Sequence, residues 1–152
     1  MWNINDLKQR LSGENRILDP WGLCGEQAIL RIEAGLNVKI SGSIREFVFE
    51  LGNLRIPPFS IVLSGDMVGR FSAVTQSKNL WNEYPFLAAL QNIKLMEHAG
   101  EDFFYSCNNG DVMAFESVHP IPGMETLRWS SFDEFMNWII AESNSVFEKK
   151  RI

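Results

Sequence analysis

The segment FFYSCNNGDVMAFES, residues 103–117, restricts the fold more than any other part of this chain. Two runs rich in aromatic and β-branched residues, Phe103–Cys107 and Val112–Phe115, flank the tetrapeptide Asn108–Asp111. Asn-Gly favours positive φ at both central positions of a tight turn, which matches the twist of antiparallel strands. The sequence therefore predicts a β-hairpin with a type I′ turn, and the fold must contain an antiparallel sheet.

Helical and extended patterns surround this hairpin. The expected elements are, in chain order, helices over 2–11, over 26–36 and from Ser41 or Ser43 to Leu51, a strand over 59–63, a strand or extended loop over 67–74, a helix over 79–90, a strand over 93–98, the hairpin, and a helix from Ser130 or Ser131 to Ile140. Glu46 and Glu134 stand at the capping-box spacing from Ser43 and Ser131. This order predicts an α+β fold in which the N-terminal helices and the C-terminal helix pack on one face of an antiparallel sheet.

Length and composition limit the class of protein. The 152 residues suit a single domain over 1–152, and a hydrophobic content of 45% excludes disorder. The net charge of −5 argues against nucleic acid as the main partner, because binding phosphates requires a basic surface. No apolar run approaches the roughly 20 residues of a membrane-spanning helix, and no secretory signal is recognised. We expect a cytoplasmic protein in which Cys24 and Cys107 are reduced, mostly buried thiols.

Residues that carry catalysis form no recognisable motif. The histidines, His98 and His119, have no neighbouring nucleophile signature and are interpreted as strand-end and loop residues. The sequence contains no phosphate-binding glycine loop, no paired cysteines and no HxxxH, so neither a cofactor nor a metal site is expected. The adjacent acids Glu101 and Asp102 are a poor acid–base pair, because neighbours in a strand point to opposite faces. We expect no enzymatic activity.

The acidic residues are concentrated near the C-terminus. Nine acids lie between Glu101 and Glu148, with Arg128 as the one base among them. Such a run is commonly a solvated face that maintains solubility. It also has the charge that a docking surface for a basic partner requires. The second interpretation makes Glu101, Asp102, Asp111 and Glu116 the candidate partner-binding residues.

Tryptophan residues offer a second candidate site. Trp21 and Trp81 lie in irregular segments and could line a groove for a peptide or small molecule. Trp138 continues the apolar face of the last helix. Because aromatic residues are more often plain core, both interpretations of Trp21 and Trp81 remain open.

Three segments, spread over residues 13–142, resemble in their order the SUKH superfamily, which includes bacterial toxin-immunity proteins and a fungal regulator of cell-wall glucan synthesis. GEQAILRIEAGLNVKISGSIREFVFELGNLRI is similar to the family's two helices and the turn after them, with Glu33 as the family-pattern glutamate. The family's Leu-Pro is absent, since Lys39-Ile40-Ser41 stands in its place. GEDFFYSCNNGDVMAFES resembles the family's hairpin, and SSFDEFMNWII resembles its closing helix.

The resemblance implies a domain that binds other proteins and carries no catalytic residues. The function expected first is that of a bacterial immunity protein, which neutralises a toxin, such as a basic nuclease, by binding and occluding it. A regulatory scaffold like the fungal member is one alternative. A ligand-binding or enzymatic pocket around Trp21 and Trp81 is another, with Glu33 beside them. For Glu33 an intramolecular hydrogen bond or a solvated position is the simpler interpretation.

Overall fold

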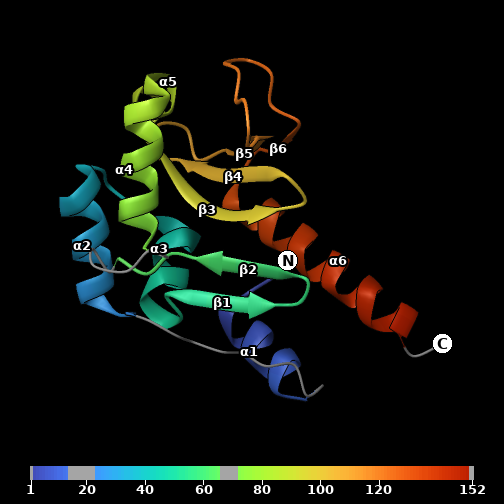
Figure 1. Cartoon of the computed structure of the whole chain (residues 1–152). Helices are drawn as coiled ribbons and strands as arrows, with labels where there is room; N and C mark the ends of the chain where they lie inside the picture. The colour runs from blue at the N-terminus through green and yellow to red at the C-terminus, as the bar shows by residue number, and fades with distance from the viewer. Residues whose placement is uncertain (1, 14–22, 66–71, 151–152) are drawn as a thin grey trace.

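The computed structural model describes residues 2–13, 23–65 and 72–150. The elements follow as α1 (Ile4–Gly13), α2 (Glu26–Leu36), α3 (Gly42–Glu50), β1 (Asn53–Ile56), β2 (Phe59–Val62), α4 (Ala73–Glu83), α5 (Pro85–Ala89), β3 (Asn92–His98), β4 (Glu101–Ser106), β5 (Val112–Glu116), β6 (Leu127–Trp129) and α6 (Phe132–Lys150). All strand pairs are antiparallel, so the fold is α+β, as predicted (Figure 1). Every helix in the described residues is too short or too polar to cross a bilayer.

The strands form two sheets. Four of them pair in the order β3-β4-β5-β6, so each strand lies beside the next along the chain. The other two, β1 and β2, form a separate hairpin whose open end is closed by Asn53, since its Oδ1 accepts hydrogen bonds from the backbone of Leu63 (2.9 Å) and Ser64 (2.8 Å). Helix α6 reaches the turn of this hairpin, where Ser143 Oγ donates to the carbonyl of Pro57 (2.6 Å).

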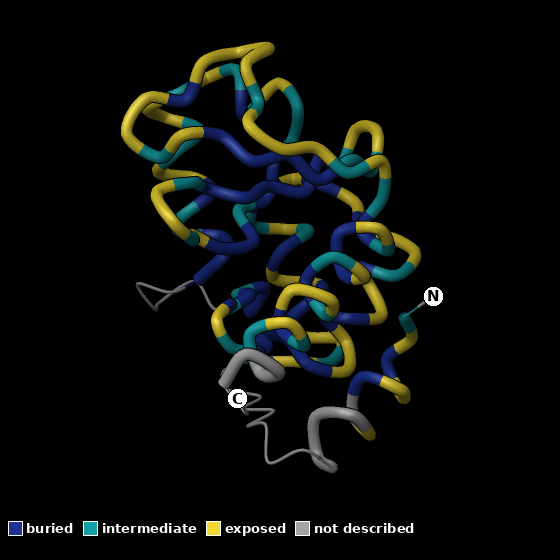
Figure 2. The backbone as a smooth tube through the Cα atoms, turned by 90° about the vertical axis from the view of Figure 1, so that its right-hand side faces the viewer, coloured by how far each residue is buried: buried dark blue, intermediate teal, exposed yellow. Residues whose placement is uncertain are grey.

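Side chains on both faces of β4 and β5 are buried, and much of the interior of the tube in Figure 2 is dark blue. Phe103 and Tyr105 join the main apolar cluster, to which α1, α2, α3 and α6 also contribute. This arrangement agrees with the predicted packing of the N- and C-terminal helices. Phe104 points to the opposite face and packs with Leu87 of α5 and Phe115 of β5, a second cluster that the sequence did not indicate.

The β4–β5 hairpin is present, but its turn differs from the predicted type I′. Only Gly110 of the Asn-Gly pair has a positive φ, +82°. The backbone of Ser106 donates to the carbonyl of Asp111 (2.9 Å), and Gly110 donates to Ser106 (2.8 Å), so four residues form the loop. Asn108 explains the longer loop, because its Nδ2 donates to the carbonyl of Ala89 (2.8 Å) and holds the loop against α5.

Two consecutive positive φ angles occur instead between β3 and β4. Ala99 has φ +52° and Gly100 has φ +79°, and the flanking His98 and Glu101 are paired in the ladder. Positive φ at both central residues is the type I′ geometry. The tight turn therefore lies one connection earlier in the chain than predicted.

The region before β3 also corrects the prediction. Ala73 and Val74, expected in a strand or extended loop, begin α4, because Ser72 Oγ accepts a hydrogen bond from the backbone of Thr75 (3.3 Å) and caps the helix. The predicted helix over 79–90 is thus the end of α4 followed by α5, which begins at Pro85. The strands β1 and β6 were not predicted, and residues 66–71 lie outside the described chain.

Serine capping is confirmed at one of the two predicted helix starts. Ser131 Oγ accepts from the backbone of Glu134 (3.1 Å), and the Glu134 carboxylate accepts in return from the backbone (3.0 Å) and hydroxyl (2.8 Å) of Ser130. These hydrogen bonds lower the pKa of Glu134. At α3 the N-cap is Ser41, without a side-chain hydrogen bond, so the Ser43–Glu46 capping box is not formed.

Gly52 joins α3 to β1 at a close backbone approach. It has φ +68°, and a Cβ added there would lie 2.2 Å from the carbonyl oxygen of Leu23. Gly123 has a similar φ of +75° with no atom within 4 Å of such a Cβ. We expect Gly123→Ala to cost about 1–2 kcal/mol of folding free energy through backbone strain alone. Gly52→Ala adds a backbone clash and is expected to cost about 3 kcal/mol or more, measured by urea denaturation. Equal losses would contradict the close approach to Leu23.

Candidate partner-binding surface

A groove of about 410 Å³ lies between α5 and the β5–β6 connection. Phe86 and Ala89 of α5, with the C-cap residue Leu90, form one wall, and Pro122 and Gly123 of the connection form the other. The floor is β5, through Met113 and Phe115, and Asn109, Glu125 and Arg128 complete the lining. A mostly apolar concavity with a few polar groups at one end is the usual form of a binding site.

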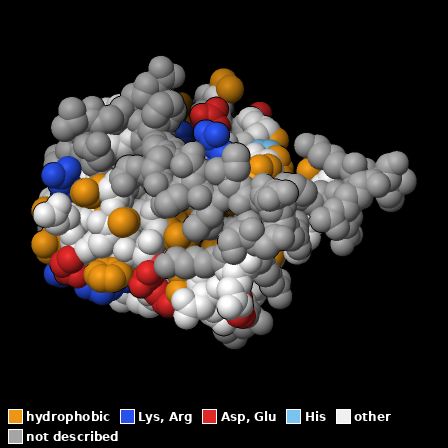
Figure 3. Space-filling model, turned by 90° about the horizontal axis from the view of Figure 1, so that it is seen from below, with side chains coloured by type: hydrophobic (Ala, Val, Ile, Leu, Met, Phe, Trp, Pro, Cys, Tyr) orange, Lys and Arg blue, Asp and Glu red, His pale blue; other side chains and the backbone are white. Residues whose placement is uncertain are grey.

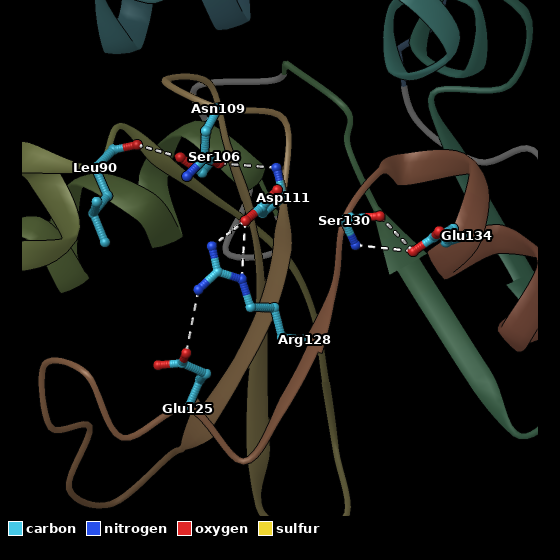
Figure 4. A network of polar contacts seen from close by, with 8 residues as sticks. All are labelled: Leu90, Ser106, Asn109, Asp111, Glu125, Arg128, Ser130 and Glu134. Carbon is cyan, nitrogen blue, oxygen red and sulfur yellow. Dashed lines mark hydrogen bonds and ion pairs between the residues drawn. The ribbon is translucent and has the colours of Figure 1, made fainter.

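The local sequence places α5 beside the sheet. Pro85 begins the helix at a position where its missing N–H is not needed. The other end is tied to the β4–β5 hairpin, because Ser106 Oγ donates to the carbonyl of Leu90 (2.9 Å). The Ser106–Leu90 contact, shown in Figure 4, and the bond from Asn108 to Ala89 together hold one groove wall in position.

The β5–β6 connection, residues 117–126, presents apolar side chains to solvent. Val118 is 86% exposed and Met124 is 66% exposed, while Ile121 and the first residue of β6, Leu127, are also exposed. Backbone hydrogen bonds hold the connection at both ends, from Ser117 to Gly100 (2.9 Å) and from Thr126 to Ala114 (2.9 Å). Figure 1 shows it extending away from the sheet. A gathered set of exposed apolar residues on a held loop is characteristic of an interaction surface.

Other exposed apolar side chains are separated from one another by charge. Leu30 and Phe49, at 55% and 44% exposure, lie on α2 and α3, which an ion pair between Glu26 and Arg45 (3.3 Å) connects. In the view from below, the described hydrophobic side chains lie among acidic, basic and polar ones (Figure 3). We therefore take the groove and the β5–β6 connection as the candidate surface.

An ion-pair network closes the polar end of the groove. Arg128 Nε donates to Asp111 Oδ2 (2.9 Å), and a second guanidinium nitrogen bonds to the same oxygen. Arg128 Nη1 lies 3.4 Å from Glu125 Oε1 (Figure 4). The hydrogen bond to Asp111 is the main reason that the pKa of Arg128 is raised further. Two carboxylates face one guanidinium, so this end of the groove is anionic.

The four acids predicted to bind a partner have different environments. Asp111 belongs to the network just described. Glu101 and Glu116 are directly opposite each other on β4 and β5, and the hydroxyl of Thr126 donates to Glu101. Glu116 is exposed, without an ion pair among the described residues. Asp102 is not available for docking, because it is buried beside Lys94.

The Asp102–Lys94 ion pair connects β4 with β3. Lys94 Nζ lies 3.3 Å from Asp102 Oδ1 and 3.7 Å from Glu97 Oε2. The side chains of Lys94 and Asp102 are only 12% and 8% exposed. Asp102 also contributes, after burial and Glu83, to the raised pKa of Tyr84. This acid therefore has a structural role.

Of the residues predicted to line an aromatic groove, those that the structure describes make contacts within the fold. Trp21 lies outside the described residues. The Trp81 indole packs against both apolar clusters and donates to the carbonyl of Asn92 (2.7 Å), and Trp138 packs against the main cluster. Glu33 accepts from the backbone of Ile40 (3.0 Å), which is the intramolecular role weighed against a site role.

Histidines and cysteines are not gathered into a site. His98 packs edge-on against Phe59 at 4.7 Å between ring centroids, and His119 is exposed. No group of three or more potential metal ligands occurs among the residues that the structure describes. Both cysteines are free thiols, but Cys24 is exposed, so the prediction that it is buried was wrong. Burial, followed by the charge of Glu33, raises the pKa of Cys107 to about 12.

Comparison with family models and with curated proteins finds no match to this chain. The resemblance to the SUKH superfamily therefore stays a prediction. The groove was not predicted from the sequence, because its lining comes from three segments whose meeting depends on the tertiary fold. The signal that could have indicated it is the run of apolar residues between Glu116 and Arg128, which alternate with prolines and polar residues.

Removing the Asp102 carboxylate should destabilise the fold. Asp102→Ala leaves the Lys94 ammonium in a buried site with only Glu97 nearby, and we expect a loss of about 3 kcal/mol of unfolding free energy. Glu116→Ala, which removes an exposed acid from the adjacent strand, is the matched control and should change it by about 0.5 kcal/mol or less. Urea denaturation measures both. A loss no larger than the control's would mean that Asp102 is a surface acid after all.

Cys107 should be protected from thiol reagents in the folded protein. With a pKa near 12 it holds almost no thiolate at pH 8, so in Cys24→Ser it should react about a hundredfold or more slowly than in urea. Because the pKa is raised from 9.0, the stability contributed by the neutral thiol is present below pH 9 and is lost as the pH rises toward 12. A fast reaction at pH 8 in the folded variant would contradict this environment.

Proposed function

We propose that this chain is a non-enzymatic protein-binding domain, and that it acts as an immunity protein which neutralises a toxin by covering it. The observation that carries the proposal is the groove beside the β5–β6 connection, together with the exposed side chains of Val118 and Met124 on that connection. Apolar anchors surrounded by a polar rim are the usual composition of protein interfaces. Such a surface needs no catalytic residue to inhibit, since occlusion of a partner's active site is sufficient.

Charge supports the same proposal. The net charge of −5 repels nucleic acid and attracts a cationic protein, and long-range attraction raises the association rate. Nucleases that act on phosphates present basic active sites, which an acidic inhibitor complements. The resemblance of three segments to the SUKH superfamily points in the same direction. A regulatory scaffold would use the same surface, and the identity of the partner separates the two functions.

Co-expression with the product of the adjacent gene tests this proposal. We expect a complex that co-purifies, and suppression of the partner's toxicity in growing cells. In Val118→Asp/Met124→Asp two apolar anchors become charged, so the affinity should fall about tenfold to a hundredfold.

Leu30→Asp/Phe49→Asp provides the control, because it changes a comparably exposed apolar pair on α2 and α3. It should bind as the unaltered protein does. All four positions are exposed, so both variants should fold, which circular dichroism verifies. Equal loss in the two variants would exclude the groove face as the interface. Absence of any complex, with toxicity unchanged, would exclude the immunity role.

A further inference from the structure

We propose, on the basis of the function proposed above, that the groove receives one apolar side chain from a cationic segment of the partner. The floor is made by Met113 and Phe115, which are buried, and the flexible thioether of Met113 can adapt to an aliphatic or aromatic anchor. The volume, about 410 Å³, lies at the small end of the range for ligand pockets. It therefore suits one anchoring side chain with its flanking backbone better than a packed helix.

The cationic character of the segment follows from the charges around the groove. Asp111 and Glu125 share Arg128, so this end retains one uncompensated negative charge. The side chains of Asp111 and Glu125 are 14% and 23% exposed, which leaves their oxygens partly accessible to an incoming lysine or arginine. A partner side chain could bind there without displacing Arg128, since a carboxylate accepts several hydrogen bonds.

A second pair of acids lies where the β5–β6 connection leaves the sheet. Glu116 ends β5 and is directly opposite Glu101, and no lysine or arginine among the described residues pairs with either of them. Like charges opposite each other in a sheet destabilise it, so a partner cation between them would relieve repulsion. Glu116 alternates to the face of the sheet opposite Met113 and Phe115, so these two acids lie beside the connection and outside the groove. A partner that fills the groove meets Asp111, Glu125 and Arg128, and this net negative charge favours a basic segment over an acidic one.

A set of four designed peptides tests this inference with defined probes. Each is a nine-residue glycine- and serine-based peptide with one central residue, leucine or serine, flanked on both sides by two lysines or two glutamates. Methyl-¹³C-methionine NMR of the full chain reports binding at two positions, since Met113 lies on the groove floor and Met124 on the connection. Met96 and Met136 are buried in the main core and serve as internal controls.

The lysine-flanked leucine peptide should shift the methyl signals of Met113 and Met124 and leave those of Met96 and Met136 unchanged. Replacing its leucine by serine should weaken binding about tenfold, because a buried aliphatic side chain is lost. Replacing its lysines by glutamates should weaken binding about tenfold at low salt, and this difference should shrink in 0.5 M salt. Glu125→Gln should reduce the affinity for the lysine-flanked peptide a few-fold, because it removes the uncompensated negative charge at this end of the groove.

Three results would overturn the inference. Stronger binding of the glutamate-flanked peptide would make Arg128 the recognition group and the partner acidic. Methyl shifts that depend on protein concentration without any peptide would mean that a second copy of the chain fills the groove. Loss of co-purification in Val118→Asp/Met124→Asp, with no shift by any peptide, would leave the proposed function standing and exclude this anchor. The expected peptide binding, together with no toxin partner in the co-expression experiment, would leave the anchor site standing and exclude the proposed immunity function.

Discussion

Burial of β4 on both of its faces is the constraint on which the rest of the structure depends. Five of its six residues are buried, and adjacent aromatic residues serve two different clusters. Phe103 lies 5.9 Å from Trp129 and 6.1 Å from Phe135 between ring centroids, so it joins β6 and α6 to the sheet. Phe104 lies 6.1 Å from Phe115 on the other face, beneath α5. Such pairs contribute about 0.5–1.5 kcal/mol each beyond the area they bury. One strand therefore positions both walls of the groove.

The number of acidic residues in the sequence does not show how many of them are available at the surface. Asp102 is neutralised by Lys94, Asp111 by Arg128, and Glu134 is used to cap α6. Asp133 accepts a hydrogen bond from the Trp2 indole (2.8 Å) and so joins the N-terminus to the last helix. Several acids of the run therefore have structural roles that neither interpretation included, and a smaller number remain at the β5–β6 connection.

The sequence predicted correctly those elements whose structure depends on residues close together in the chain. The spacing of Ile29, Ile32 and Leu36 predicted α2, and Ser131 with Glu134 predicted the start of α6. Prediction failed where contacts between residues far apart in the chain determine the structure. Asn108 bonds to α5 rather than completing a two-residue turn. Two consecutive positive φ angles occur in a different connection, at Ala99-Gly100. Strand β6 was missed because only three residues pair with β5, and two of these are exposed.

The groove itself is a consequence of chain connectivity. Helix α5 has five residues, because Tyr84-Pro85 separates it from α4 and Gln91, with φ +50°, turns the chain into β3. The groove lies beside this short helix, over Met113 and Phe115, which are themselves buried, and the bonds from Ser106 and Asn108 hold the helix in place. The same bonds keep the cavity formed before any partner arrives, so little ordering of the groove opposes binding. An apolar side chain from another molecule can therefore gain contacts there that no side chain of this fold is placed to make.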